Sequence, residues 1–276
     1  MPINPRPPTR SSFGSQLRLR HALSPVALLS VGLCAAGPSD ATTNLPFVPG
    51  EKLVYDVTVN SGHKVGQASM WIEGPVDVRG TSTYLLRFDS RVRIALMSGV
   101  SSSSSWFDPD ARESLRFRKS ERSPLGHTSE SVEMFPATKS WTGADGKTGV
   151  SPQGSPLDEL SFIYFIRTLP MVAGEAHRYD RHFDAARDPV IIQVVRPEVI
   201  PTAMGEVKTM LVEMRVRDPK HYKEDGVIRF NISNDACRLP VRIESTMPMI
   251  GQTVMTMKSM RTENSRGDCS AVTRGL

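Results

Sequence analysis

The chain has 276 residues, of which 23% are charged, and its formal net charge at pH 7 is +5. Without residues 1–41 it keeps 30 basic and 28 acidic residues, so most of the net positive charge belongs to the N-terminal segment. A nucleic-acid-binding protein would be expected to keep a concentrated basic stripe. The remaining chain scatters its charges, so no nucleic acid is expected as a partner.

The N-terminal segment has the layout of a secretory signal peptide. Four arginines precede or adjoin an apolar run over residues 22–36, and no acidic residue comes before Asp40. This run is short for a membrane span, so no transmembrane segment is expected in the mature chain. Cleavage is predicted after residue 41, with position 36 as the alternative, and Leu33 before Cys34 argues against lipidation. The predicted location is the periplasm, with association to the outer membrane left open.

Cysteine usage agrees with export. Cys34 lies in the predicted signal peptide, which leaves Cys237 and Cys269 as an even pair. In an oxidising compartment an even pair predicts a disulfide between Cys237 and Cys269. The alternative is two thiols that lie too far apart to meet.

The first half of the mature chain is typical of short antiparallel strands separated by turns. Residues 52–59 alternate apolar and polar side chains, and an Asn-Ser-Gly turn leads to a second strand over 65–72, which together predict a hairpin. Further strands are expected over residues 83–93, 113–121, 128–135, 139–141 and 147–150. The serine run 101–105 is interpreted as a solvated strand or loop, with a hydroxyl-rich ligand surface as the alternative.

One segment predicts a helix, over about residues 156–168. Ser155 suits the N-cap and Pro156 the first helical position. Apolar residues cover most of the circumference, which indicates an enclosed helix. Tyr164 and Arg167 could present polar tips to a ligand near the end of this helix. A buried Arg167 would need a carboxylate partner, with Glu51 and Asp235 as candidates, and a structural ion pair is the preferred role.

Strands resume after the helix. They are predicted over residues 176–183, 190–196, 206–217, 227–233, 239–246 and 252–261. Pro240 lacks a backbone donor, which predicts the start or edge of a strand there. We therefore expect a single β-rich domain over residues 42–276, mainly β, with a large curved antiparallel sheet or open barrel wrapped around one apolar helix.

Four motifs occur in order along the chain. These are the opening Phe47, Pro49, Gly50, Glu51 and Tyr55, the run D-E-L-S-x-x-Y-x-x-R over 158–167, Gly205 before a strand, and N-x-S-x-D followed by R-L-P-V over 231–241. In this order and spacing the chain resembles the bacterial domain-of-unknown-function family 3108. The resemblance implies an exported, mostly antiparallel β protein with no established reaction, similar in shape to the periplasmic lipoprotein carriers, whose curved sheet wraps a helix.

Methionine is abundant, with 13 residues in all. Met247 with Met249, and Met255 with Met257, fall two residues apart and so share a strand face. Such pairs could bind Cu(I), line an adaptable apolar cavity or fill a core, and the core is preferred over the cavity and the cavity over the metal. These four methionines join Tyr164 and Arg167 as the candidate ligand-binding residues.

Catalytic motifs are missing from the sequence. It contains no G-x-S-x-G elbow, H-E-x-x-H pair, phosphate loop or dinucleotide glycine fingerprint. Asp180, His182 and Asp184 could offer ligands to a metal, but the neighbouring arginines favour a solvated polar face. No catalytic residue, metal or cofactor is therefore expected, and the protein is not predicted to be an enzyme.

The sequence thus predicts an exported periplasmic protein that binds a lipid-like or otherwise apolar ligand, or an envelope partner. One alternative is a structural or assembly factor of the cell envelope with a filled core and no small ligand. A further alternative is an enzyme of an unlisted type, which would need polar titratable groups converging in a cleft.

Overall fold

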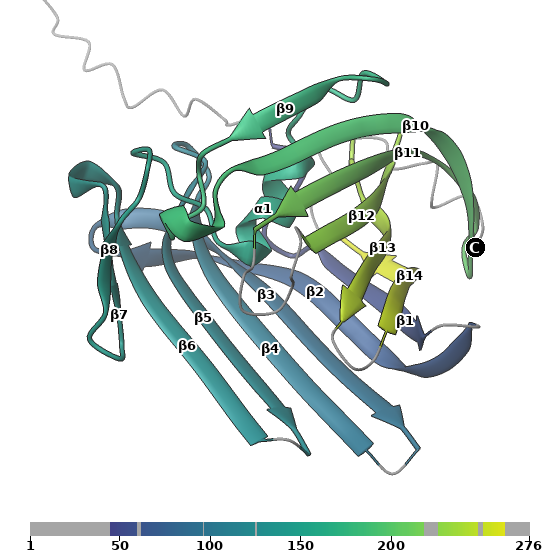
Figure 1. Ribbon diagram of the computed structural model, residues 1–276. Helices are drawn as coiled ribbons and strands as arrows, with labels where there is room; N and C mark the ends of the chain where they lie inside the picture. Colours follow the sequence, from purple (N-terminus) through teal and green to yellow (C-terminus); the bar gives the residue numbers. More distant parts are fainter. Residues whose placement is uncertain are drawn as a thin grey trace, which may run out of the picture. The chain divides into compact units, whose positions relative to one another are not determined.

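The computed structural model describes residues 45–59, 62–95, 97–124, 126–217, 226–247 and 251–262, without the side chain of Met247. These residues form one antiparallel sheet of 14 strands, which is not closed, and one α-helix (Figure 1). The predicted mainly-β fold, an open antiparallel sheet with one helix, is confirmed. The predicted signal peptide 1–41, Met249 and Cys269 lie outside the described residues.

The strands follow chain order in two runs that meet where β1 pairs with β14. The first run contains β1 (Lys52–Val59), β2 (His63–Val78), β3 (Thr81–Ile94), β4 (Met97–Asp108), β5 (Glu113–Ser123), β6 (Gly126–Phe135), β7 (Ser140–Gly143) and β8 (Thr148–Val150). The second contains β9 (Ala176–Tyr179), β10 (Val190–Thr202), β11 (Gly205–Val216), β12 (Gly226–Ser233), β13 (Pro240–Met247) and β14 (Gly251–Arg261). The helix α1 (Glu159–Ile166) lies in the chain between the two edge strands, β8 and β9.

Period-two alternation accounts for the strands. On β1, Leu53, Tyr55 and Val57 are buried while Lys52 is exposed, as expected where one sheet face meets the core. Strand β2 runs past Pro75, beyond its predicted end at residue 72, because a register shift between Glu73 and Val76 accommodates the proline without ending the pairing with β3. Pro240 is the first residue of β13, as predicted.

One hydrophobic core joins the helix to the inner face of the sheet. Its fully buried side chains, from both the sheet and the helix, include Leu53, Met70, Leu86, Phe107, Phe117, Phe162, Tyr164 and Ile166. Strands β3 and β4 both contact α1. Figure 1 shows α1 with strands of both runs on either side of it. A smaller cluster of Val78, Leu85, Trp106 and Leu115 packs separately. The helix is therefore enclosed, as its apolar circumference predicted.

The helix begins later than predicted, and its cap is a different residue. Asp158 is the N-cap, with its Oδ1 accepting hydrogen bonds from the backbone N–H groups of Leu160 and Ser161 at 2.9 Å. The Ser161 hydroxyl accepts from the Asp158 N–H at 2.8 Å, which completes a capping box. Residues 156 and 157 instead bond to neighbouring extended chain, since the Pro156 carbonyl accepts from the Ser114 N–H at 2.8 Å. Ser155 is therefore not the cap.

The predicted strand over 176–183 ends early, at Tyr179. Beyond it the chain turns inward, because Leu157 forms a parallel bridge with His182. The His182 side chain stacks on Phe162 at 6.3 Å between ring centroids. Since His182 is only 2% exposed, the prediction of a solvated polar face was wrong at this residue.

Candidate functional site

The core contains a buried ion pair at the C-terminal end of α1. The Arg167 guanidinium donates from Nη1 to Glu51 Oε1 at 2.6 Å and from Nη2 to Oε2 at 2.8 Å. Nη2 also reaches the carbonyls of Pro46, at 3.1 Å, and Cys237, at 2.9 Å. The side chain of Arg167 is fully buried, so these partners replace the water that the charge has lost. The pair joins the segment before β1, the helix end and the corner before β13.

Of the two carboxylates proposed for Arg167, Glu51 is the partner. Asp235 has another role, because its Oδ1 accepts from the Ser233 hydroxyl at 2.7 Å and from the N–H groups of Cys237 and Arg238. These bonds hold the turn between β12 and β13. Three of the four family-like motifs therefore meet in one buried arrangement, in which Glu51 and the Cys237 carbonyl of the turn both accept from Arg167.

Aromatic rings surround the ion pair. The Arg167 Cζ atom lies 5.0 Å from the Phe47 ring centroid and 5.5 Å from that of Tyr164, within cation–π range. Phe47 and Tyr164 pack edge to face at 5.1 Å. The hydroxyl of Tyr55 donates to the Pro240 carbonyl at 2.9 Å, whereas the Tyr164 hydroxyl has no partner among the described residues.

The surroundings fix the charge states of these groups. Burial by itself lowers the pKa of Arg167, but the Glu51 carboxylate outweighs it, so this pKa is raised. Burial raises the pKa of Tyr164, and Glu51 raises it further. Burial likewise raises the pKa of Tyr55. Arg167 is thus held charged and both phenols neutral, an arrangement that suits a structural centre rather than proton transfer.

Tyr164 and Arg167 are therefore brought together inside the core, without exposure to solvent. Met257 is also fully buried and faces Tyr55 across β1 and β14. Met255 faces Val57 and is partly exposed. Met249 and the side chain of Met247 lie outside the described residues.

Beyond this centre, an apolar row crosses the inner face of six strands. We call the apolar row the register-paired residues Val92, Gly66, Val57, Met255, Ile243 and Phe230, from β3, β2, β1, β14, β13 and β12. Gly66 permits close strand approach, because a Cβ there would lie 2.0 Å from the Arg91 carbonyl oxygen. Val57, Ile243 and Phe230 are buried, whereas Val92 and Met255 are partly exposed. The apolar row therefore runs from buried positions in the core to positions that solvent partly reaches.

Polar groups lie beside the apolar row on the same face. Ser90 lies two residues before Val92 on β3 and pairs with Ser101 on β4, and Ser103 pairs with Phe88. Phe88 and the three serines are partly exposed, as is Val92. The arrangement offers apolar contact area with a few hydroxyls next to it, the composition found in small-molecule sites.

A second buried polar cluster lies at the N-terminal end of α1. The Ser105 hydroxyl donates to Asp158 Oδ2 at 2.6 Å, and the Ser114 hydroxyl donates to that of Ser161 at 2.8 Å. None of the four is exposed. Burial raises the pKa of Asp158 to about 6, although the Ser105 hydrogen bond opposes this rise.

The sequence interpretation missed this cluster because it treated residues 101–105 as a solvated run. That interpretation was wrong for Ser105, which lies on a strand and is fully buried. Alternation could have identified it, because Ser105 is two residues before Phe107 and therefore shares its face.

His182 is a buried neutral imidazole. Its Nδ1 accepts from the Asp184 N–H at 3.0 Å, and its Nε2 has no partner among the described residues. Burial lowers the pKa of His182 to about 4. Asp158 bonds to Ser105 rather than to this imidazole. Within the part of the chain described, no three His, Cys, Asp or Glu residues are grouped to hold a metal ion.

Cys237 is disulfide-bonded. Its predicted partner, Cys269, lies outside the described residues, so the pairing stays a prediction. No helix in the described part of the chain is both long and apolar enough to cross a membrane.

Comparison with known proteins gives a family and a fold. The family described as "Protein of unknown function (DUF3108)" matches residues 54–258. No curated protein matches the chain. A β-barrel-like protein of domain family DUF1849 from Brucella abortus has 12% sequence identity and a TM-score of 0.52, covering 79% of this chain and all of its own. This likeness shows the fold alone.

Two other solved structures overlap less well. A candidate lipoprotein from Parabacteroides distasonis has 12% identity and a TM-score of 0.30, with coverage of 79% of this chain and 97% of its own. A candidate exported protein with a YmcC-like fold from Bacteroides fragilis has 10% identity and a TM-score of 0.29, with coverage of 78% and 97%.

Proposed function

The chain belongs to the DUF3108 family of proteins of unknown function, and we propose that it is an exported, non-enzymatic protein that binds a lipid-like or otherwise apolar ligand. Export is supported by the arginines and apolar run before residue 41. Neither the family nor the described residues point to catalysis. The proposed location is the periplasm.

The observation that carries the ligand proposal is the incomplete cover of the apolar row. Side chains of this row are buried at Val57, Ile243 and Phe230, yet Val92 on β3 and Met255 on β14 stay partly exposed. Apolar inner-face surface that water reaches is costly and commonly marks a binding surface. Methionine adapts its shape to different apolar partners, so Met255 suits a ligand of variable chain geometry.

The proposed ligand has an apolar body and a small polar group. Its apolar part would lie along Val92 and Met255, while the hydroxyls of Ser90 and Ser101 would meet the polar group. The Arg167 and Glu51 pair has no part in binding, because both side chains are enclosed and already satisfied by each other. This assigns ligand contact to Met255 and support of the fold to Tyr164, Arg167 and Met257.

Native mass spectrometry with lipid extraction tests this proposal on protein purified from its own host. A stoichiometric apolar adduct is expected. Replacing Met255 with Asp would place a charge in the apolar row and should lower uptake of the fluorescent probe N-phenyl-1-naphthylamine at least tenfold. Val199→Asp is the matched control, because Val199 is 55% exposed and lies away from the row on β10.

Two results would overturn the ligand proposal. The first is a clean apo mass together with no probe uptake by wild type. The second is equal uptake by Met255→Asp, Val199→Asp and wild-type protein, each shown by circular dichroism to be folded. Met255→Leu should retain uptake, which separates loss of the apolar surface from loss of the methionine itself.

The alternative of an envelope assembly factor is favoured by a different observation. The core between α1 and the sheet is one continuous cluster, and its polar groups are largely paired with each other. A protein whose interior is filled in this way can serve as a rigid partner for other proteins. A clean apo mass would favour this alternative.

A further inference from the structure

The face of β3–β6 that lies opposite the helix has its own composition. On β3, Leu86 is buried in the core on the helix side, so Arg87, Asp89, Arg91 and Arg93 lie on the other face. Register extends this face to β6 through the row Arg91, Val100, Arg122 and His127. We define the outer hairpin face as the residues of β3–β6 that point away from the helix, from the row of Arg87 to the hairpin ends.

Arginine dominates the outer hairpin face. Arg91, Arg93 and Arg122 are exposed, and none forms an ion pair with a described residue. By contrast, the exposed arginines Arg178 and Arg196 on the other run of strands pair with Asp180 and Glu198. Among the described residues of β3–β6, Asp89 is the only acidic residue in the rows that form the outer hairpin face. The face therefore carries uncompensated positive charge.

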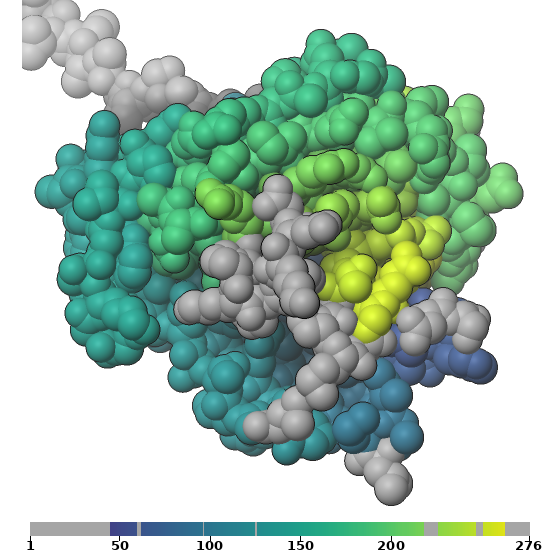
Figure 2. Space-filling model, viewed as in Figure 1, coloured from purple at the N-terminus to yellow at the C-terminus, as the bar shows by residue number. Residues whose placement is uncertain are grey.

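An exposed apolar side chain lies near the end of the same hairpin on this face, since Val100 on β4 is 45% exposed. Met97, at 57% exposure, pairs with Ile94 and so belongs by alternation to the helix side of the sheet. Val100 lies between Arg91 and Arg122 in its row. In Figure 2 the blue and teal atoms of β3–β6 form the lower edge of the view. An apolar side chain set among unpaired cations matches the two layers of a lipid interface, acyl chains and anionic headgroups.

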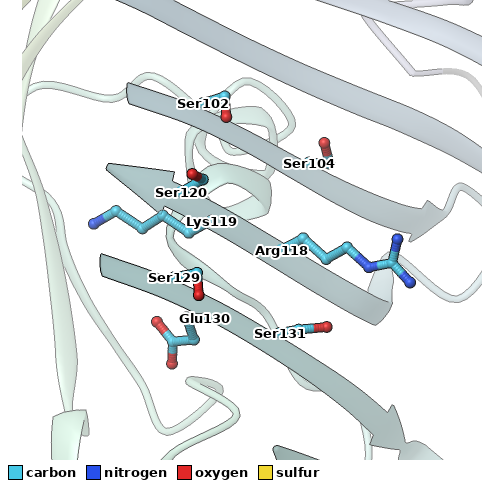
Figure 3. A pocket seen from close by; sticks show the side chains of 8 residues that line it. All are labelled: Ser102, Ser104, Arg118, Lys119, Ser120, Ser129, Glu130 and Ser131. Carbon is cyan, nitrogen blue, oxygen red and sulfur yellow. The ribbon is translucent and has the colours of Figure 1, made fainter. Parts of the chain in front are cut away.

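Farther from the hairpin ends, the outer hairpin face carries small side chains with hydroxyl groups. An open depression over β4, β5 and β6 is lined by Ser102, Ser104, Ser120, Ser129 and Ser131, together with Arg118, Lys119 and Glu130 (Figure 3). Two register-paired rows across β4, β5 and β6 form this depression. One row is Ser104, Arg118 and Ser131, and the other is Ser102, Ser120 and Ser129. Hydroxyl and guanidinium donors at this spacing suit phosphate oxygens.

We propose that the outer hairpin face docks on an anionic lipid bilayer, with Val100 at the acyl boundary and the arginines on headgroup phosphates. The inference is independent of the ligand proposal, since it uses the opposite face of the sheet. Each surface arginine contributes roughly fivefold to partition onto anionic membranes. Charge and apolar contact act together here, because neither alone gives stable attachment.

Vesicle flotation of the full chain tests the proposal. Wild-type protein is expected to float with phosphatidylglycerol-containing vesicles and not with pure phosphatidylcholine. The triple variant Arg91→Gln, Arg93→Gln, Arg122→Gln should partition about a hundredfold more weakly. The matched control is Arg178→Gln, Arg196→Gln, Arg215→Gln, which removes equal charge from exposed, ion-paired positions and should float like wild type. High salt should release wild-type protein, because it shortens the screening length.

A second measurement does not depend on loss of binding. The variant V100W should show a blue shift of tryptophan emission with anionic vesicles and quenching by brominated acyl chains. Equal flotation of the two triple variants would overturn the proposal, as would unchanged emission of V100W. Binding to an anionic polysaccharide with no binding to anionic vesicles would also overturn it and would assign the same face to a polymer.

Discussion

The guanidinium of Arg167 at the end of α1 and the carboxylate of Glu51, 116 residues earlier, form a bidentate ion pair at 2.6 and 2.8 Å. The same guanidinium reaches the carbonyls of Pro46 and Cys237, so one side chain links three distant segments. Because its charge is enclosed, the whole arrangement depends on both partners being present.

Replacing Glu51 with Ala should strongly destabilise the fold. The change leaves the Arg167 charge buried without a counter-charge, and breaking a buried pair in this way costs roughly 3–5 kcal/mol. Urea unfolding followed by circular dichroism measures the difference. The double variant Glu51→Gln, Arg167→Met is the control, because it removes both charges and should recover much of the loss. A loss below about 1 kcal/mol for Glu51→Ala would contradict the prediction.

Asp158 should make stability fall as pH rises. Its pKa is raised from 3.8 to about 6 by burial, so its contribution is fully present below pH 3.8 and is lost as pH rises through 6. Asp158→Asn stays neutral, so its unfolding free energy relative to wild type should rise between pH 4 and 7 by up to about 3 kcal/mol. Denaturant titrations at several pH values measure this difference.

Ser105→Ala is the companion variant for this test. Ser105 donates to the carboxylate and lowers its pKa, so removing the hydroxyl should move the midpoint of the pH dependence above 6. A difference between Asp158→Asn and wild type that stays constant from pH 4 to 7 would show that the carboxyl titrates normally.

His182 should act in the opposite direction. Burial lowers its pKa from 6.5 to about 4, so its contribution is present above pH 6.5 and is lost as pH falls through 4. Glu159 opposes this shift and Arg187 adds to it. His182→Asn keeps an acceptor for the Asp184 N–H but has no group that titrates in this range. As pH falls from 7 to 4, its free energy of unfolding should therefore decrease by up to about 3 kcal/mol less than that of wild type. Parallel stability curves from pH 7 to 4 would rule out a buried neutral imidazole.

The disulfide at Cys237 should involve Cys269. Peptide mapping under non-reducing conditions is expected to recover the two cysteines in one cross-linked fragment. Closing a loop of about 30 residues stabilises by roughly 3–4 kcal/mol, so Cys269→Ser should lower the urea midpoint as much as reduction does. Recovery of a Cys34–Cys237 fragment instead would assign the bond differently and would show that the N-terminal segment is retained.

Local patterns were sufficient for most of the strands. Alternation on β1 and β14 is visible in the sequence because each strand has one buried and one more exposed face. Strand β12 alternates in sequence too, but Asn231 and Ser233 on its polar side are buried. The helix was recognisable from its continuous apolar circumference. Its start was not, because Ser155 and Asp158 are both suitable caps and the choice depends on which backbone groups bond elsewhere.

The candidate site was predicted only in part. Sequence alone identified that a buried Arg167 requires a carboxylate and named Glu51 among two candidates, since the cost of an unpaired charge is a general property. It could not rank Glu51 above Asp235, nor foresee that Ser105 is buried against Asp158. Those facts depend on which strands pair, and in what register, across the sheet.

The sequence by itself therefore determined the class of the fold, its antiparallel strands, its single enclosed helix and the need for a buried counter-charge. The tertiary structure decided the pairing of β1 with β14, the partner of Arg167, and the partial exposure of Val92 and Met255 in a row whose other members are mostly buried. The physical reason is range, because alternation and capping act within a few residues, whereas ion pairs and surface exposure depend on segments that are distant in the chain.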